Sequence, residues 1–300
     1  MNKFANELIE ELKKIMGEEY SMSISQDVKE NDTVLDVLVF ESNKGVHCFK
    51  LGIMHYYFLH QMGVNINTIA EKIIDENHQS ITRELFEKIA KMGNMDEYEK
   101  IKDKLVIKLI NTDLNRIYLR DKVSIPFLDL SAVFCVFLEE KDSMQKTITV
   151  TEKLFSKWKI SKEQMYREVL ENMQKNFPEE ITLLADYLAD ELEERERTQS
   201  MDTLFVMQQP LEKCGGALML YKDALRKFAL EKGVKRVAIY PSSIQEILLE
   251  AVYSDDFDYA HREEIVRSIN QRFVSEDEVL SNHMYFYDLE QNEVKMCKGE

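Results

Sequence analysis

A cysteine beside two glycines is one of two places in this sequence where residue types and spacing suggest chemistry. Cys214 precedes Gly215 and Gly216, so a thiolate could attack a carbonyl while glycine amides stabilise the oxyanion. Such a nucleophile needs a base, and no histidine can be assigned as its partner. The same residues fit a Gly-Gly turn between two strands, which is the structure we expect. The glycine pair is neither a phosphate loop nor a dinucleotide fingerprint, because the following Lys-Ser/Thr and the later glycine are missing.

The second place is the stretch AIYPSSIQEIL, where an apolar run meets Pro241 and two serines follow. Ser242 or Ser243 could be a nucleophile and Glu246 an acid or base, although the Gly-x-Ser-x-Gly elbow is absent. Each serine is followed three residues later by Gln or Glu, which is the spacing of a capping box. Local structure therefore explains these residues, and we expect a helix over 243–251 with Ser243 as its N-cap.

The two places could also form one ligand site. A helix that begins at this point exposes free N–H groups, which bind anions, so Gly215, Gly216 and Ser242 are ligand-binding candidates. Open sheets place ligands at the ends of adjacent strands, where both segments could meet. In that arrangement the Cys214 and Ser242 side chains would converge on one cavity. We expect instead that the serines bond only within their own helix.

The histidines and cysteines predict no metal site and no cofactor. His55 and His60 are five residues apart and diverge around a helix, and no Cys-x-x-Cys pair is present. The four cysteines are widely separated, at positions 48, 135, 214 and 297, which is typical of a reduced, cytoplasmic protein. The apolar stretch at 130–138 is too short to cross a membrane.

The charge of the chain limits its partners. The formal net charge is −16, from 55 acidic and 39 basic residues, and it is spread along the sequence. Such a surface repels phosphate groups, so direct binding to nucleic acid or to an anionic membrane is disfavoured. An acidic inhibitor of a nucleic-acid enzyme is compatible with this charge, although such mimics concentrate their acidic residues more strongly.

The pattern of apolar residues predicts an α+β protein. An amphipathic helix over 3–16 is followed by an antiparallel meander with strands at 21–28, 34–40 and 46–51. Helices near 56–62, 66–74 and 85–92 come next. Strands are expected at 105–110, 128–138 and 147–151, with a short helix that ends before Pro126. The segment around Cys135 is apolar on both faces, which favours a strand in the middle of a sheet. A buried helix is the alternative, which periodicity alone does not exclude.

The rest of the chain predicts a helix after Ser161, a helix over 181–194 and then a C-terminal β-α-β-α segment with a terminal hairpin. Within that segment the expected strands are 203–208, 217–220 and 235–240, and the expected helices are 221–232, 243–251 and 258–273. The charged stretch ELEERERTQS suggests a boundary between lobes 1–197 and 198–300. A single folded unit is the alternative.

Five stretches carry a resemblance to a known family: INTDLNRIYL, IPFLDLSAVF, GGALMLY, PSSIQEIL and LSNHMYFYD. In this order they resemble a bacterial domain-of-unknown-function family of about 300 residues, familiar from gut anaerobes. The resemblance covers nearly the whole chain and implies no activity. In that family the position of Gln245 is often His. If that histidine is an acid–base group, this chain lacks it, whereas Gln can replace it if its role is to close the capping box or to fill space.

No complete catalytic set can be named from the sequence. We therefore expect a non-catalytic protein-binding or adaptor module in the cytoplasm, with another protein as its partner. The alternative is a small hydrolase or transferase with its site at residues 214–216 and 240–246. Its catalytic candidates would be Cys214, Ser242, Ser243 and Glu246.

Overall fold

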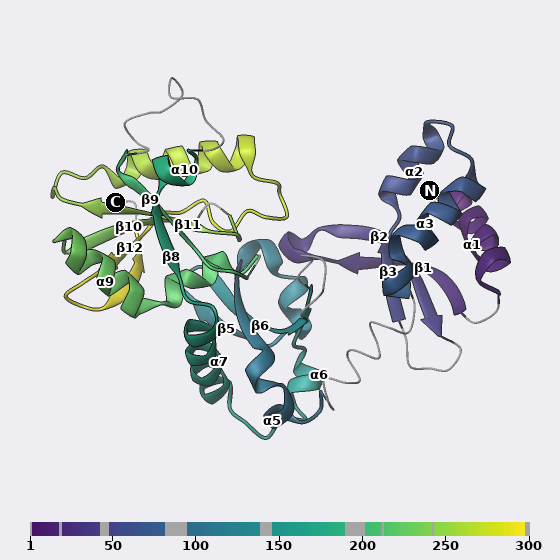
Figure 1. Cartoon of the computed structure of the whole chain (residues 1–300), viewed down its shortest axis with the longest axis horizontal. Helices are drawn as coiled ribbons and strands as arrows, with labels where there is room; N and C mark the ends of the chain where they lie inside the picture. The colour runs from purple at the N-terminus through teal and green to yellow at the C-terminus, as the bar shows by residue number, and fades with distance from the viewer. Residues whose placement is uncertain are drawn as a thin grey trace. The chain divides into compact units, whose positions relative to one another are not determined.

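The computed structural model is an α+β structure of two compact units, Met1–Met95 and Asp96–Glu300 (Figure 1). It describes residues 2–17, 20–42, 48–81, 95–138, 146–189, 202–211, 213–241 and 243–297. The predicted boundary at 197/198 lies outside the described residues. The helix expected near 85–92 also lies outside the described residues.

The first unit is the predicted helix and meander followed by two helices. Its elements are α1 (Asn2–Met16), β1 (Tyr20–Val28), the 3-10 turn η2 (Glu30–Asp32), β2 (Val34–Ser42), β3 (Cys48–Gly52), α2 (Met54–Gln61) and α3 (Ile66–Ile81). The strands pair antiparallel in the order β1-β2-β3. The prediction of a helix with a three-stranded meander is confirmed.

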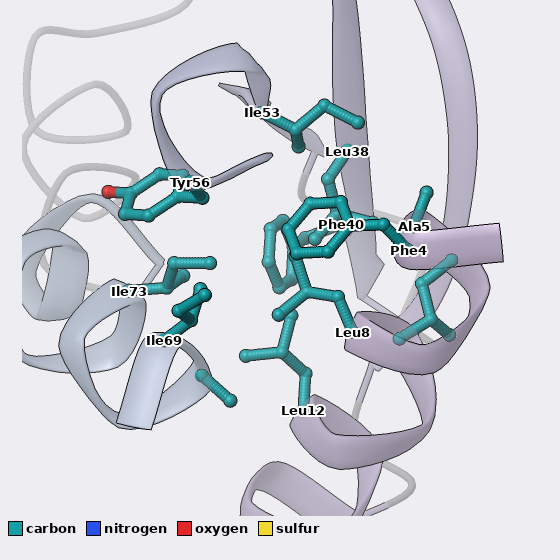
Figure 2. Close-up of a cluster of buried hydrophobic side chains, with 12 residues drawn as sticks. Phe4, Ala5, Leu8, Leu12, Leu38, Phe40, Ile53, Tyr56, Ile69 and Ile73 are labelled. Carbon is teal, nitrogen blue, oxygen red and sulfur yellow. The ribbon is translucent and has the colours of Figure 1, made fainter. Parts of the chain in front are cut away.

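One face of the meander packs against α1 and α3. Leu8 and Leu12 are one helical turn apart, so both project from α1 toward the sheet. Phe40 meets them from β2, and Ile69 and Ile73 complete the cluster from α3 (Figure 2). All five side chains are buried, and α2 joins the same core through one face only.

The second unit begins with a sheet in which β6 pairs with three other strands. Its strands are β4 (Leu105–Asn111), β5 (Ser124–Phe127), β6 (Leu130–Leu138) and β7 (Lys146–Thr149). Cys135 is buried in β6, which confirms its expected place inside a sheet. The sequence did not predict β5, because it contains Pro126. This strand pairs only with β6, and an edge strand tolerates a residue without an N–H donor.

Short helices and turns border this sheet. They are α5 (Tyr98–Ile101), η3 (Lys102–Lys104), η4 (Asp113–Asn115), η5 (Tyr118–Asp121), α6 (Glu152–Phe155) and the longer α7 (Lys162–Asn176). Two of these 3-10 turns replace the short helix expected before Pro126. The N-cap predicted for α7 is confirmed, since Ser161 Oγ accepts a hydrogen bond from the Gln164 N–H at 3.1 Å.

The second sheet of this unit has six antiparallel strands in the order β13-β12-β10-β11-β9-β8. They are β8 (Glu180–Leu183), β9 (Leu204–Gln208), β10 (Arg236–Tyr240), β11 (Ile247–Val252), β12 (Tyr285–Asp288) and β13 (Glu293–Met296). The helical elements are α8 (Leu184–Tyr187), η8 (Gly215–Leu220), α9 (Lys222–Lys232) and α10 (Tyr259–Phe273). Helices α9 and α10 lie on opposite sides of the sheet (Figure 1).

Three predictions in this region are wrong. The helix expected over 181–194 is β8 and the single turn α8 in its described part, and the strand expected over 217–220 is η8. The helix expected over 243–251 is the strand β11, which pairs with β10 and β9. Both faces of β11 are covered, so its sequence lacks the alternation that would have indicated a strand.

In the part of the chain that the structure describes, no helix has the length and apolar character needed to cross a membrane.

Candidate functional site

The two segments that the sequence singled out do meet, through their backbones. The Gly216 N–H donates to the Ile244 carbonyl at 3.4 Å. Gly215 packs against the Gln245 carbonyl so closely that a Cβ at this position would lie well inside contact distance. Only glycine fits there, because the obstructing atoms belong to rigid backbone rather than to a side chain. The glycines therefore serve the close approach of two chain segments.

Cys214 is not open to a substrate at this junction. It is 2% exposed and immediately precedes η8, so the predicted turn between two strands is wrong. Its carbonyl accepts a hydrogen bond from Gln209 Nε2 at 2.7 Å, and the phenol of Tyr221 donates to Gln209 Oε1 at 3.1 Å. Burial raises the pKa of Tyr221 far above its usual value. These contacts hold the cysteine backbone in the core.

Ser243 is not the N-cap of a helix, because β11 begins at Ile247 and no helix follows the serine. It is 8% exposed, pairs with Val279 in an isolated bridge, and its Oγ accepts from the Gln245 N–H at 2.9 Å. This bond spans two residues and stabilises a turn. The anion site expected at a helix N-terminus loses its basis for the same reason. Ser242 lies outside the described residues, so its distance from Cys214 is not defined.

Glu246 is the candidate whose ionisation is clearly perturbed. Burial, and secondarily the charge of Glu278, raise the pKa of its carboxyl group. Within the described residues it forms no hydrogen bond. Its neighbour Gln245 donates to Glu278 Oε2 at 3.1 Å, and Lys213 Nζ lies 3.7 Å from Glu278 Oε1. A perturbed carboxyl group is compatible with acid–base chemistry, but neither Cys214 nor Ser243 presents an open nucleophile beside it.

A buried polar network closes this end of the sheet, and no local pattern of residues indicated it. Ser281 Oγ donates to Asp129 Oδ2 at 3.2 Å, and the Tyr285 hydroxyl donates to Asp129 Oδ1 and lies 2.9 Å from Ser281 Oγ. Asn111 Nδ2 donates to the Leu280 carbonyl at 3.1 Å. Burial and the nearby carboxylate raise the pKa of Tyr285 well above its usual range. The network joins three of the stretches that carry the family resemblance.

The segment that contains Ser281 also seals the junction. The Ile244 N–H donates to the Glu278 carbonyl at 3.1 Å, and the Ser281 N–H donates to the Pro241 carbonyl at 3.3 Å. Leu280 is fully buried against Gly216. The polar groups of the Asp129 network and of this segment thus bond to one another within the protein.

A second buried network lies between the sheet and α10. Glu250 is buried and its Oε1 lies 2.9 Å from the Arg262 guanidinium, while its Oε2 accepts from the Tyr240 hydroxyl. Burial, followed by the bond to Glu250, raises the pKa of Tyr240 far above its usual value. Every charge is matched, so the arrangement is that of a structural ion pair. Its sequence signal was a lone Glu within the apolar run ILLEAV.

The opposite end of β10 is open. A cleft of about 390 Å³ is formed there by residues from the α9–β10, β11–α10 and β12–β13 connections. Its ten lining residues are Gly233, Val234, Lys235, Arg236, Val252, Tyr253, Ser254, Asp255, Asp288 and Glu290. Sequence reasoning missed this cleft, since its residues come from three separate loops and form no motif.

His55 and His60 both lie on the short helix α2, where a spacing of five residues directs their side chains apart, as predicted. Among the residues that the structure describes, no three His, Cys, Asp or Glu side chains are grouped as metal ligands would be.

Comparison with known proteins gives one match. Neither a curated protein nor a solved structure is significantly similar to the chain. The model of a family of unknown function, DUF5688, matches residues 1–289 of the 300. The protein is therefore a member of this family.

Proposed function

We propose that the protein is a non-catalytic protein-binding module and that α2 provides its binding surface. Met54 and Phe58 are four residues apart on one face of this helix, and Met62 follows at the same interval as its C-cap residue. Their side chains are 44%, 58% and 82% exposed. Methionine and phenylalanine on an exposed helix face are typical of surfaces that bind other proteins.

The α2 face also carries no charge. Residues 51–70 contain no Asp, Glu, Lys or Arg, although 31% of the whole chain is charged. A helix face that remains in water is usually polar or charged. The combination of exposure and missing charge therefore supports a face that a partner covers.

The opposite face of α2 fixes its orientation in the first unit. Tyr56 is buried in the core cluster, and its hydroxyl donates to Glu76 Oε2 at 3.0 Å. Because one side of the helix is anchored in this way, the Met54, Phe58 and Met62 side chains cannot turn inward without breaking the core. The surface is thus preformed, which reduces the entropic cost of binding.

The size of the α2 face indicates the kind of partner. The helix has 8 residues and is about 12 Å long, so it cannot alone supply the ~800 Å² per partner of a standard interface. A charged partner surface would lose hydration here without gaining an ion pair. We therefore infer a transient contact with an uncharged, apolar helix or groove of another protein.

The buried state of the nucleophile candidates supports the non-catalytic part of the proposal. Cys214 and Ser243 are almost inaccessible, and the Ser243 hydroxyl is engaged in its own turn. The proposed cytoplasmic location rests on the separated cysteines alone.

Site-specific crosslinking in the native host tests the proposal. The photoreactive residue p-benzoylphenylalanine replaces Phe58 and, as a matched control, the exposed Tyr187 of the second unit. We expect crosslinks to a different protein from position 58 only, and we expect the additional change Met62→Glu to abolish them. Crosslinks to another copy of this chain would replace the proposal with self-association. The absence of any protein crosslink at position 58 would refute it.

A further inference from the structure

The cleft at the open end of the six-stranded sheet has a distinctive charge arrangement. Some of its ionic groups are matched within the protein: Lys235 Nζ lies 2.8 Å from Glu290 Oε1. Asp288 lies 3.9 Å from Lys295 and accepts a hydrogen bond from the Gln291 N–H at 3.0 Å. Besides the residues of these pairs, two charged residues line the cleft, Arg236 and Asp255.

Arg236 and Asp255 also line the cleft, and the pKa of the neighbouring Lys235 ammonium group is raised chiefly by Glu290 and to a lesser extent by Asp255. Neither Arg236 nor Asp255 forms a salt bridge with the described residues, with each other or with the matched pairs. The Arg236 guanidinium lies over the Phe286 ring, 5.6 Å from its centroid, so its edge remains available to an acceptor. The cleft is thus lined by two opposite charges that form no salt bridge with each other.

The position of Asp255 is set by the turn that leaves β11. The Asp256 N–H donates to Ser254 Oγ at 3.1 Å, which fixes the turn around Asp255. The backbone of Arg236 is also held in place, since Arg236 pairs with Val252 and Asp288 in the sheet. The two unmatched charges are therefore held by the scaffold rather than by each other.

We propose that this cleft binds a small zwitterion, specifically a free α-amino acid. Its carboxylate would pair with the Arg236 guanidinium and its ammonium group with the Asp255 carboxylate. Val234, Val252 and the 76% exposed Tyr253 also line the cleft, which favours an apolar amino-acid side chain. This site belongs to the second unit and is independent of α2.

Other ligand classes fit the same charges less well. Three carboxylates, those of Asp255, Asp288 and Glu290, would repel a phosphate dianion. The Lys235 and Arg236 side chains would repel a simple organic cation. The carboxylates do not form a three-ligand group for a metal ion within the described chain. A ligand with one charge of each sign matches both unpaired residues.

Isothermal titration of the full-length protein with L-leucine tests the proposal. L-Leucinamide lacks the carboxylate and N-acetyl-L-leucine lacks the ammonium group, so each should bind at least about tenfold more weakly than leucine. Arg236→Gln should weaken leucine binding about tenfold and abolish the preference for leucine over leucinamide. Asp255→Asn should abolish the preference for leucine over N-acetyl-leucine.

Matched controls remove a charge from an exposed helix position outside the cleft. Lys227→Gln on α9 and Glu264→Gln on α10 should leave leucine binding unchanged, and circular dichroism should show all four variants folded. Equal binding of leucine and its two blocked analogues would overturn the proposal. It would also be overturned if neither leucine nor any other proteinogenic amino acid bound at millimolar concentration.

Discussion

The two ends of β10 differ in a way that their sequences do not suggest. At the end marked by Tyr240, Gly215 and Gly216 pack against residues 244–246, and a third segment around Ser281 covers this junction. At the end marked by Arg236, three loops composed of ordinary surface residues leave a cleft. Unusual residue types at the closed end serve packing, whereas the open end is formed by the topology of the sheet.

A glycine pair in a sequence is compatible with a ligand site or with the close packing of two chain segments. Gly215 and Gly216 suggested an oxyanion hole, but the first faces the Gln245 carbonyl and the second lies against the Leu280 side chain. A residue without a Cβ is needed wherever backbone approaches either a ligand or other backbone. Only the three-dimensional structure distinguishes these two cases.

The largest expected effect is at the closed end, with Gly215→Ala. The new Cβ would collide with the rigid Gln245 backbone, so we expect a loss of roughly 3 kcal/mol or more in the free energy of unfolding. Urea denaturation followed by the fluorescence of Trp158, the one tryptophan of the chain, measures this loss in the second unit.

The matched control for this variant is Gly233→Ala at the open end. Gly233 has φ +67° and free space around an added Cβ, so its cost is only that of a left-handed backbone, about 1–2 kcal/mol. Equal losses for both variants would show that the Gly215 junction is looser than the structure indicates.

Much of the fold could be predicted because local patterns agree with the final packing. The period of α1, the alternation in the meander and the Ser161 cap each depend on neighbours in sequence. β11 could not be predicted, because its apolar residues face elements on both sides of the sheet. The proline of β5 had the same effect, since only its place at a sheet edge makes it acceptable.

The candidate sites were less predictable than the fold. The sequence indicated Cys214, Ser243 and Glu246 from their residue types, and the structure brings their segments together with Cys214 and Ser243 buried. Arg236 and Asp255 look like ordinary surface charges in the sequence. What distinguishes them is that both line one cleft while neither forms a salt bridge with the residues that the structure describes, and an arrangement of distant loops leaves no local pattern.

An intermediate effect is expected for Tyr285→Phe at the closed end. The change removes a fully buried hydroxyl that donates to Asp129 and contacts Ser281, so unfolding should become easier by about 1–2 kcal/mol. Tyr253→Phe at the open end is the control and should change stability by less than about 0.5 kcal/mol, because that side chain is mostly exposed. Trp158 fluorescence again reports both. If the Tyr285 variant were as stable as the control, the buried network would not contribute to closing this end.

The smallest expected effect depends on pH and concerns Glu246. Burial raises the pKa of its carboxyl group above the ordinary value of 4.5, so the folded protein holds this proton more tightly than the unfolded chain. Stability is therefore lost as the pH rises from below 4.5 through the raised folded-state pKa, and none of the loss is present at lower pH. Gln cannot ionise, so Glu246→Gln should stabilise the protein at pH 7 and be neutral in acid. Because the group is partly solvated, we expect a gain below about 1 kcal/mol.

Denaturation curves of the wild type and Glu246→Gln, measured across this pH range, give the difference directly. Glu290→Gln is the control at the open end: it removes an exposed ion pair with Lys235 and should cost at most about 0.5 kcal/mol at pH 7. Opposite signs for the two variants at pH 7 would sharpen the contrast between a carboxyl group confined by packing and one in solvent. A stability loss for Glu246→Gln at neutral pH would instead mean that the ionised carboxylate has a favourable partner. That result would support an acid–base site at the closed end.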